Sequence, residues 1–259
     1  MKTLPRAALA AALLCIPVPG NAQEVAPFFQ QVPAVMYETY TGVNRPAFDQ
    51  YFESLVAKYE RTGGTPWAIY NENAKVAYRI TVLPEGLASV QPIQEGRVAS
   101  FQEFTEEQMK LYNSAWATRH VAVYTAAPAM SYVPDGLTLD DVRDMPYNRT
   151  QIYHLKWDKA GAFRAALARR AELDREGGID NLVLTAWNGG IGTETQVVMI
   201  RVSAESLDAD RAGLAERMRI REAYWDEWVA QNDIMNDATV SIERHDQTRV
   251  NRLSYPVRR

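Results

Sequence analysis

The chain has 259 residues, with 28 Lys and Arg against 32 Asp and Glu and a formal net charge of −4 at pH 7. Charges of both signs are interspersed along the sequence without a basic stripe, which argues against a nucleic-acid-binding protein. The one cysteine, Cys15, lies in a segment that we expect to be removed on export. The mature chain would then have no disulfides, no thiol catalysis and no thiolate metal site.

The first 22 residues have the layout of a cleavable export signal. Two basic residues precede the apolar run 7–16, prolines follow it, and small residues come before the expected cleavage point after Ala22. A membrane anchor would need about 20 apolar residues. A lipoprotein signal is disfavoured because Leu14, rather than a small residue, precedes Cys15. We therefore predict a periplasmic or secreted protein that has no membrane contact once the signal is removed.

A polar leader at 23–34 is expected to be poorly ordered, and the first folded unit is predicted over 35–127. Its elements are predicted as a strand at 35–41, a helix that ends at Gly63 and Gly64, a hairpin of strands at 66–71 and 75–83, a less regular stretch at 83–104, a helix that begins at Thr105 with a capping box to Gln108, and a strand at 119–126. The first helix is the clearest, because its apolar residues have the three- and four-residue spacing of one helical face: Phe48, Tyr51, Phe52, Leu55, Val56 and Tyr59.

A linker at 128–149 precedes a second unit, predicted over 150–246, and a loosely held tail follows at 247–259. The second unit is predicted as a strand at 150–157, a helix at 159–176 with Phe163 and Leu167 inward, a hairpin of strands at 181–188 and 193–202, one long helix at 206–232 and a strand at 239–245. Gly189 to Gly192 lie between two strands and have no helix after them, so they predict a hairpin turn and not a phosphate-binding loop.

Both units follow the order β-α-β-β-α-β, and their sequences are alike at both ends. Segment 35–40 leads into a helix that opens on Phe48, and segment 151–157 leads into one that opens on Phe163. Each unit would form four antiparallel strands with helices on one face only, so two units in one chain can cover each other's open sheet face. The predicted fold class is α+β, with two ferredoxin-like repeats that form a pseudo-dimeric α+β barrel.

In this order of elements the chain resembles the dimeric α+β barrel superfamily, in a fused, two-repeat form. The first strand and the helix that opens on Phe48 are also similar to NIPSNAP-type domains. The superfamily includes cofactor-free monooxygenases, haem-dependent enzymes and non-catalytic ligand binders. The resemblance therefore implies a fold with a cavity, but it does not select one activity.

Strand alternation predicts which residues line the cavity between the two units. Aligning Tyr37 with Tyr153 puts Glu38 and His154 at equivalent positions on the cavity face. The same alternation in two further strands leaves Arg79 and Glu243 on that face. The predicted ligand-binding residues are therefore Glu38, Arg79, His154 and Glu243.

These ionisable residues have two interpretations, because a buried charge needs a partner or water. They could form a polar pocket for an anionic or hydrophobic small molecule, with Arg79 as the anion contact. They could instead be a solvated sheet face or structural ion pairs between the units. His154 could also act as an acid or base near neutral pH, or as a haem ligand.

No motif in the sequence identifies a metal site or a nucleophile. The three histidines, at 120, 154 and 245, lack the spacing of a metal site, and no G-x-S-x-G surrounds a serine. We predict a non-catalytic protein without a cofactor, a monomer or weak homodimer, that binds a small ligand in the inter-repeat cavity. The alternative is a cofactor-free or haem-dependent oxygenase-like enzyme with His154 as base. A third interpretation, which a cavity filled by side chains would favour, is a purely structural or interaction role.

Overall fold

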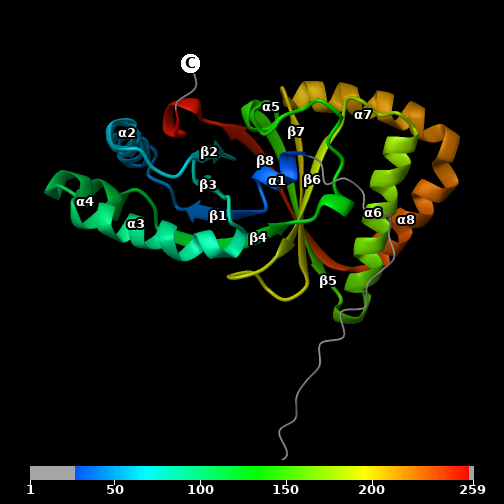
Figure 1. Ribbon diagram of the computed structural model, residues 1–259, viewed down its shortest axis with the longest axis horizontal. Coiled ribbons are helices and arrows are strands. Elements are labelled where there is room, and N and C mark those ends of the chain that lie inside the picture. Colours follow the sequence, from blue (N-terminus) through cyan, green and yellow to red (C-terminus); the bar gives the residue numbers. More distant parts are fainter. Residues whose placement is uncertain (1–26, 257–259) are drawn as a thin grey trace, which may run out of the picture.

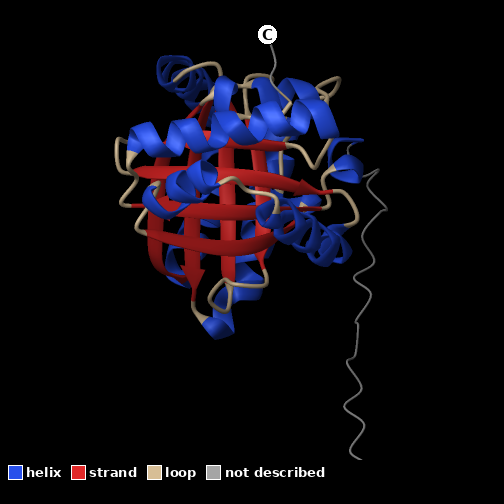
Figure 2. Cartoon of the chain, turned by 90° about the vertical axis from the view of Figure 1, so that its left-hand side faces the viewer, coloured by secondary structure: helices blue, strands red, loops and turns tan. Residues whose placement is uncertain are grey.

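A computed structural model describes residues 27–256 of the chain. The predicted export signal at 1–22 lies outside these residues. Eight antiparallel strands form a closed barrel in the order β1-β3-β2-β8-β5-β7-β6-β4, in which β4 pairs again with β1. Helices α2, α3 and α4 lie outside the barrel on one side, and α6, α7 and α8 lie outside it on the other (Figure 1; Figure 2).

The predicted element order of the first unit is confirmed, and the stretch that lacked a clear pattern is largely helical. The elements are β1 (Ala34–Thr41), α2 (Arg45–Thr62), β2 (Trp67–Asn71), β3 (Val76–Leu83), α3 (Val90–Gln102), α4 (Glu106–Ser114) and β4 (Thr118–Ala126). Gly63 ends α2 with a positive φ of 73°, a conformation that favours glycine. Thr105 caps α4 through the predicted capping box with Gln108.

The second unit repeats this order. Its elements are β5 (Tyr147–Leu155), α6 (Ala160–Glu176), β6 (Val183–Gly189), β7 (Val197–Ala204), α7 (Leu207–Arg221), α8 (Trp225–Ala238) and β8 (Thr239–Arg249). The single long helix predicted at 206–232 is two helices, because a short 3-10 turn at Glu222–Tyr224 separates α7 from α8. The predicted hairpin turn between β6 and β7 is confirmed.

The described parts of the leader and the tail are ordered, contrary to expectation. Residues 27–31 form the short helix α1 (Pro27–Gln31), whose Phe28 and Phe29 are buried in the barrel interior. In the tail, Leu253 is buried and Tyr255 forms a β-bridge with Trp67 of β2. Apolar side chains thus hold both segments against the barrel. The linker also contains a helix, α5 (Leu139–Asp144).

Each repeat contributes four consecutive strands to the barrel. The first provides β4-β1-β3-β2 and the second β8-β5-β7-β6, and the two sets meet at β2–β8 and β4–β6. One apolar cluster lies in the barrel interior and contains residues of both repeats, among them Tyr37, Tyr78, Ile152 and Met199. Two other clusters lie between the outer sheet face and the helices, around the fully buried Phe48 in the first repeat and Phe163 in the second.

Among residues 27–256, no helix is both long and apolar enough to cross a membrane.

Candidate functional site

The two faces of β1 decide where the predicted site residues lie. Tyr37 belongs to the interior cluster, whereas Tyr40 belongs to the outer cluster under α2. Tyr40 packs on Phe48 with ring centroids 5.4 Å apart, and Tyr153 packs on Phe163 at 5.0 Å. The structural equivalent of Tyr153 is therefore Tyr40 and not Tyr37. An offset of three residues is odd, so it exchanges the two faces of the strand.

The four predicted residues therefore fall into two separate groups. Glu38 and Arg79 are paired across β1 and β3 on the outer face of the sheet. His154 and Glu243 belong to the interior face, since Glu243 pairs with Ile152 of the interior cluster and His154 lies two residues further along β5. The expectation that all four line one cavity is wrong, and the error follows from the choice of tyrosine in the repeat alignment. Their roles in ligand binding stay predictions.

Glu38 is the centre of the outer group. It is fully buried and interacts with three arginines. Arg119 Nη2 lies 2.6 Å from Oε1, Arg97 Nη2 lies 2.9 Å from Oε2, and Arg79 Nε lies 3.7 Å from Oε2. The hydroxyl of Tyr40 donates a further hydrogen bond to Oε1 at 3.2 Å. One carboxylate thus holds cations from β3, α3 and β4 together.

The charges of this group do not balance. Burial raises the pKa of Glu38, but Arg79, Arg97 and Arg119 outweigh it, so the pKa lies below its ordinary value and the carboxylate is ionised. One negative charge then faces three positive charges. The excess of positive charge is available to an anion that enters beside Glu38.

A pocket of about 400 Å³ opens beside the three arginines, between the outer sheet face and α2, α3 and α4. All three arginines line it, and no described lining residue is acidic. Its aromatic wall consists of Tyr40, Tyr51, Tyr59, Phe101, Phe104, Tyr112 and Trp116. The pocket thus combines aromatic surface with uncompensated positive charge, a combination that suits a small aromatic anion.

Neighbouring side chains fix two of the arginines in place. The Arg79 guanidinium lies 4.4 Å from the centroid of the Trp67 ring, and its Nε has no hydrogen-bond partner in the part of the chain that the structure describes. Arg97 reaches from α3 to the sheet and donates to the Thr81 hydroxyl at 3.0 Å. Both cations are therefore positioned before any ligand arrives.

His154 and Glu243 take part in a different, partly exposed network on the interior face of the sheet. His154 contacts Glu194 through Nδ1 at 3.0 Å and Glu243 through Nε2 at 2.7 Å. The same Glu243 lies 3.5 Å from Nε2 of His245, whose Nδ1 contacts Glu72 at 3.1 Å. Both rings of this network are therefore held by carboxylates, and the contact of His245 with Glu72 joins the two repeats.

Neither group gathers the ligands of a metal site in the part of the chain that the structure describes. Among the described residues, no cluster of three His, Cys, Asp or Glu side chains could hold a metal ion. The outer pocket has no histidine or cysteine among its described lining residues, so it supplies neither imidazole nor thiolate to a haem iron. His154, considered above as a haem ligand, is held by two carboxylates away from this pocket.

Two residues of the outer group, Arg97 and Arg119, were not predicted from the sequence. Arg97 lies in the stretch at 83–104, which was not recognised as α3. Arg119 stands directly across from Tyr40 in the β1–β4 ladder. Assigning Tyr40 to the face under the helices would have placed Arg119, Glu38 and Arg79 there as well.

Comparison with known proteins shows the fold. No family model matches the chain, and no curated protein matches it, so the likeness to NIPSNAP-type domains stays a prediction. Among solved structures, a putative monooxygenase from Lactobacillus acidophilus NCFM is 9% identical with a TM-score of 0.54, covering 84% of this chain and 94% of that one. An anthrone oxidase-like protein is 10% identical with a TM-score of 0.54, covering 84% and 91%.

A mutant chlorite dismutase from Candidatus Nitrospira defluvii is 7% identical with a TM-score of 0.51, covering 87% of this chain and 94% of that one. Identities this low carry the architecture but not the activity. The alignments cover most of both chains, and they agree with the closed eight-stranded barrel. The chain therefore has the fold of the dimeric α+β barrel proteins, with both halves of the barrel in one polypeptide.

Proposed function

We propose that the protein binds a small aromatic anion in the outer pocket of its first repeat, beside Glu38 and under α3. The observation that carries the proposal is the group of three arginines around one buried carboxylate at the edge of an aromatic pocket of about 400 Å³. This places the ligand between sheet and helices and not in the inter-repeat cavity. The barrel is complete in one chain, which supports a monomer.

The ionisation of the pocket residues favours binding over acid–base catalysis. Glu38 has a lowered pKa and is a weak base. Burial raises the pKa of Tyr40 and of Tyr51 well above the ordinary value, so neither hydroxyl ionises near neutral pH. A general acid or base works best with a pKa near the working pH, and these groups are far from it.

An oxygenase-like activity is the second candidate. Two structural neighbours are described as a putative monooxygenase and an anthrone oxidase-like protein. The excess positive charge at Arg79, Arg97 and Arg119 would favour the ionised, electron-rich form of a bound phenol. Oxygen uptake in the presence of a bound phenol would support this candidate, whereas binding without oxygen uptake would support the first.

A pair of matched fluorescent probes tests the binding proposal. 1-Anilinonaphthalene-8-sulfonate is an aromatic anion, and N-phenyl-1-naphthylamine is the same ring system without the sulfonate. The sulfonate is expected to bind at least about tenfold more tightly than the neutral probe, because a charge-assisted contact to arginine is the difference between them. Arg119→Met should remove most of that preference and leave the neutral probe's affinity within about twofold.

Arg219→Met provides the control for this experiment, because Arg219 is exposed on α7 and pairs only with the neighbouring Glu216 in the described chain. It should change neither affinity. Equal affinity of the native protein for both probes would overturn the proposal. So would an unchanged preference in Arg119→Met.

We also propose that the protein works outside the cytoplasm, on the sequence pattern of residues 1–22. Intact-mass measurement of the exported protein should give a chain that starts at or near Gln23. A mass that includes the first 22 residues would contradict this. Native mass measurement of the same sample would show whether a small molecule stays bound.

A further inference from the structure

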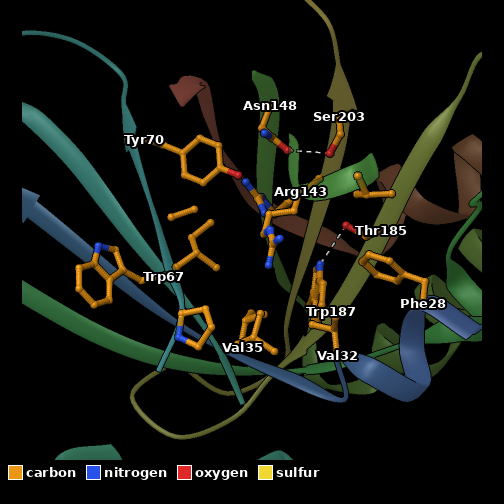
Figure 3. A pocket seen from close by; sticks show the side chains of 16 residues that line it. Phe28, Val32, Val35, Trp67, Tyr70, Arg143, Asn148, Thr185, Trp187 and Ser203 are labelled. Carbon is orange, nitrogen blue, oxygen red and sulfur yellow. Dashed lines mark hydrogen bonds between the residues drawn. The ribbon is translucent and has the colours of Figure 1, made fainter. Parts of the chain in front are cut away.

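A second, smaller cavity lies inside the barrel, apart from the outer pocket. Its volume is about 70 Å³. Figure 3 shows Phe28, Val32 and Val35 on one side of it and Tyr70, Asn148 and Arg143 on the other. Its lining comes from both repeats and from α1 and α5. The proposed function does not use this cavity.

Asn148 of β5 presents an unused donor in this cavity. The side chain is only 1% exposed. The Ser203 hydroxyl donates to its Oδ1 at 2.7 Å, as Figure 3 shows, so the oxygen of the amide is occupied. Its Nδ2 has no hydrogen-bond partner among residues 27–256. A buried amide N–H₂ without an acceptor is costly, and an acceptor in the cavity would remove that cost.

Arg201 of β7 provides a second hydrogen-bond donor and a positive charge in this cavity. Its Nε donates to the Thr150 hydroxyl at 3.3 Å, and its guanidinium lies 5.1 Å from the centroid of the Tyr70 ring. Its Nη2 is buried, and no group of the described chain accepts a hydrogen bond from it. The Thr185 oxygen already accepts from Trp187 Nε1 at 3.1 Å. The Nη2 amino group of Arg201 is therefore available to donate to an acceptor from outside.

The charge of Arg201 is also uncompensated within the cavity. No described residue that lines it is acidic. The other lining arginine, Arg143, is paired with Asp140 at 2.7 Å. A cation beside an amide donor, with apolar walls opposite, is the arrangement that recognises a carboxylate with a short hydrocarbon chain.

We propose that this cavity is a second binding site and that it takes a small aliphatic monocarboxylate. One carboxylate oxygen accepts from Arg201 Nη2 and the other from Asn148 Nδ2. The hydrocarbon chain packs on Phe28, Val32 and Trp187. The small volume excludes ring systems of the size that the outer pocket admits.

Calorimetric titration of the full mature protein with butyrate and with butyramide tests this site. The two probes have nearly the same shape and differ in charge. Butyrate is expected to bind at least about tenfold more tightly than butyramide. Arg201→Met should weaken butyrate by at least about tenfold and leave butyramide within about twofold. Asn148→Ala should weaken both probes, since it removes a donor that each can use.

Two other variants separate this site from the outer pocket and from general charge effects. Arg143→Met removes the lining arginine that is already paired, and Arg97→Met removes a cation of the outer pocket. Neither should change butyrate affinity by more than about twofold. Butyrate binding that is lost in Arg97→Met would overturn the proposal by placing the acid in the outer pocket.

Equal affinity of the native protein for butyrate and butyramide, or no detectable binding of butyrate, would overturn it too. If Arg201→Met fails to fold, the comparison of the two probes in the native protein and in Asn148→Ala still tests whether the carboxylate binds in this cavity. Failure here would leave the probe experiment at Arg119 unaffected, because the two sites share no arginine.

Discussion

Glu38 is a buried carboxylate that forms ion pairs with three arginines. Replacing it by glutamine keeps the shape but removes the negative charge that Arg79, Arg97 and Arg119 share. Breaking a buried pair costs about 3–5 kcal/mol, because the remaining charge stays buried without compensation. We therefore expect Glu38→Gln to lower the free energy of unfolding by about that amount at pH 7, as measured by denaturant unfolding.

The pKa of Glu38 determines how the stability difference between the native protein and Glu38→Gln changes with pH. The pKa of Glu38 in the folded protein lies below its ordinary value of 4.5. A depressed pKa contributes stability that is fully present above the unfolded value and is lost as pH falls through the folded value. The difference between native protein and Glu38→Gln should thus be constant above about pH 5 and should shrink at lower pH. A constant difference down to pH 3 would contradict this assignment.

His154 presents the opposite case, because its partners are exposed. The side chains of Glu194 and Glu243 are 78% and 52% exposed, so water screens both contacts. His154→Ala is expected to cost less than about 1 kcal/mol and to leave the affinity for the naphthalene sulfonate unchanged. Denaturant unfolding and probe titration measure the two effects. A loss of sulfonate binding in this variant would link the interior network to the outer pocket and would contradict their separation.

At the scale of elements, Phe48 and Phe163 are equivalent. Each opens the first helix of its repeat, each is fully buried, and each packs on the matching tyrosine of the preceding strand. We expect Phe48→Ala and Phe163→Ala to lower the free energy of unfolding by similar amounts, about 3–5 kcal/mol each. Phe101→Ala, at a partly exposed ring of α3, is the control and should cost less. A loss below about 1 kcal/mol at either buried site would contradict the equivalence.

Elements with a strong apolar pattern could be predicted from the sequence, and those without one could not. The buried residues of α2 coincide with the apolar spacing, except that Tyr59 is only half-buried and Ala47 is buried as well. In contrast, α3 has no fully buried residue, and it contains Gly96 and Pro92, so neither periodicity nor propensity indicated it. Because α3 supplies Arg97 and one wall of the outer pocket, missing the helix meant missing part of the site.

Alternation in a strand separates two faces but does not say which of them lies inside. In β1 the first five residues are all buried, because one face packs in the barrel and the other packs under helices. Burial therefore does not distinguish the faces of β1, and aligning Tyr37 with Tyr153 places Glu38 on the wrong one. The aromatic contact of Tyr40 with Phe48 determines the face, and that contact is visible only in the structure.

At the scale of the whole molecule, the two repeats are not independent domains. The ladders between them are short, with two residue pairs between β2 and β8 and three between β4 and β6. The interior cluster, however, joins side chains of both repeats across the barrel axis, such as Tyr37 and Tyr124 with Ile152 and Met199. Opening one repeat would expose the apolar interior face of the other.

This shared interior predicts one cooperative unfolding transition for the whole chain. Calorimetric and van't Hoff enthalpies should agree, because both repeats unfold together. Phe48→Ala and Phe163→Ala, in the outer clusters of different repeats, should each lower the midpoint of that one transition without splitting it. Independent repeats would behave otherwise, since Phe163→Ala would then produce an early transition and leave a second at the native temperature. Such a split thermogram would show that interior packing is weaker than the separate sheet–helix layers, and it would contradict the single closed barrel as the unit of folding.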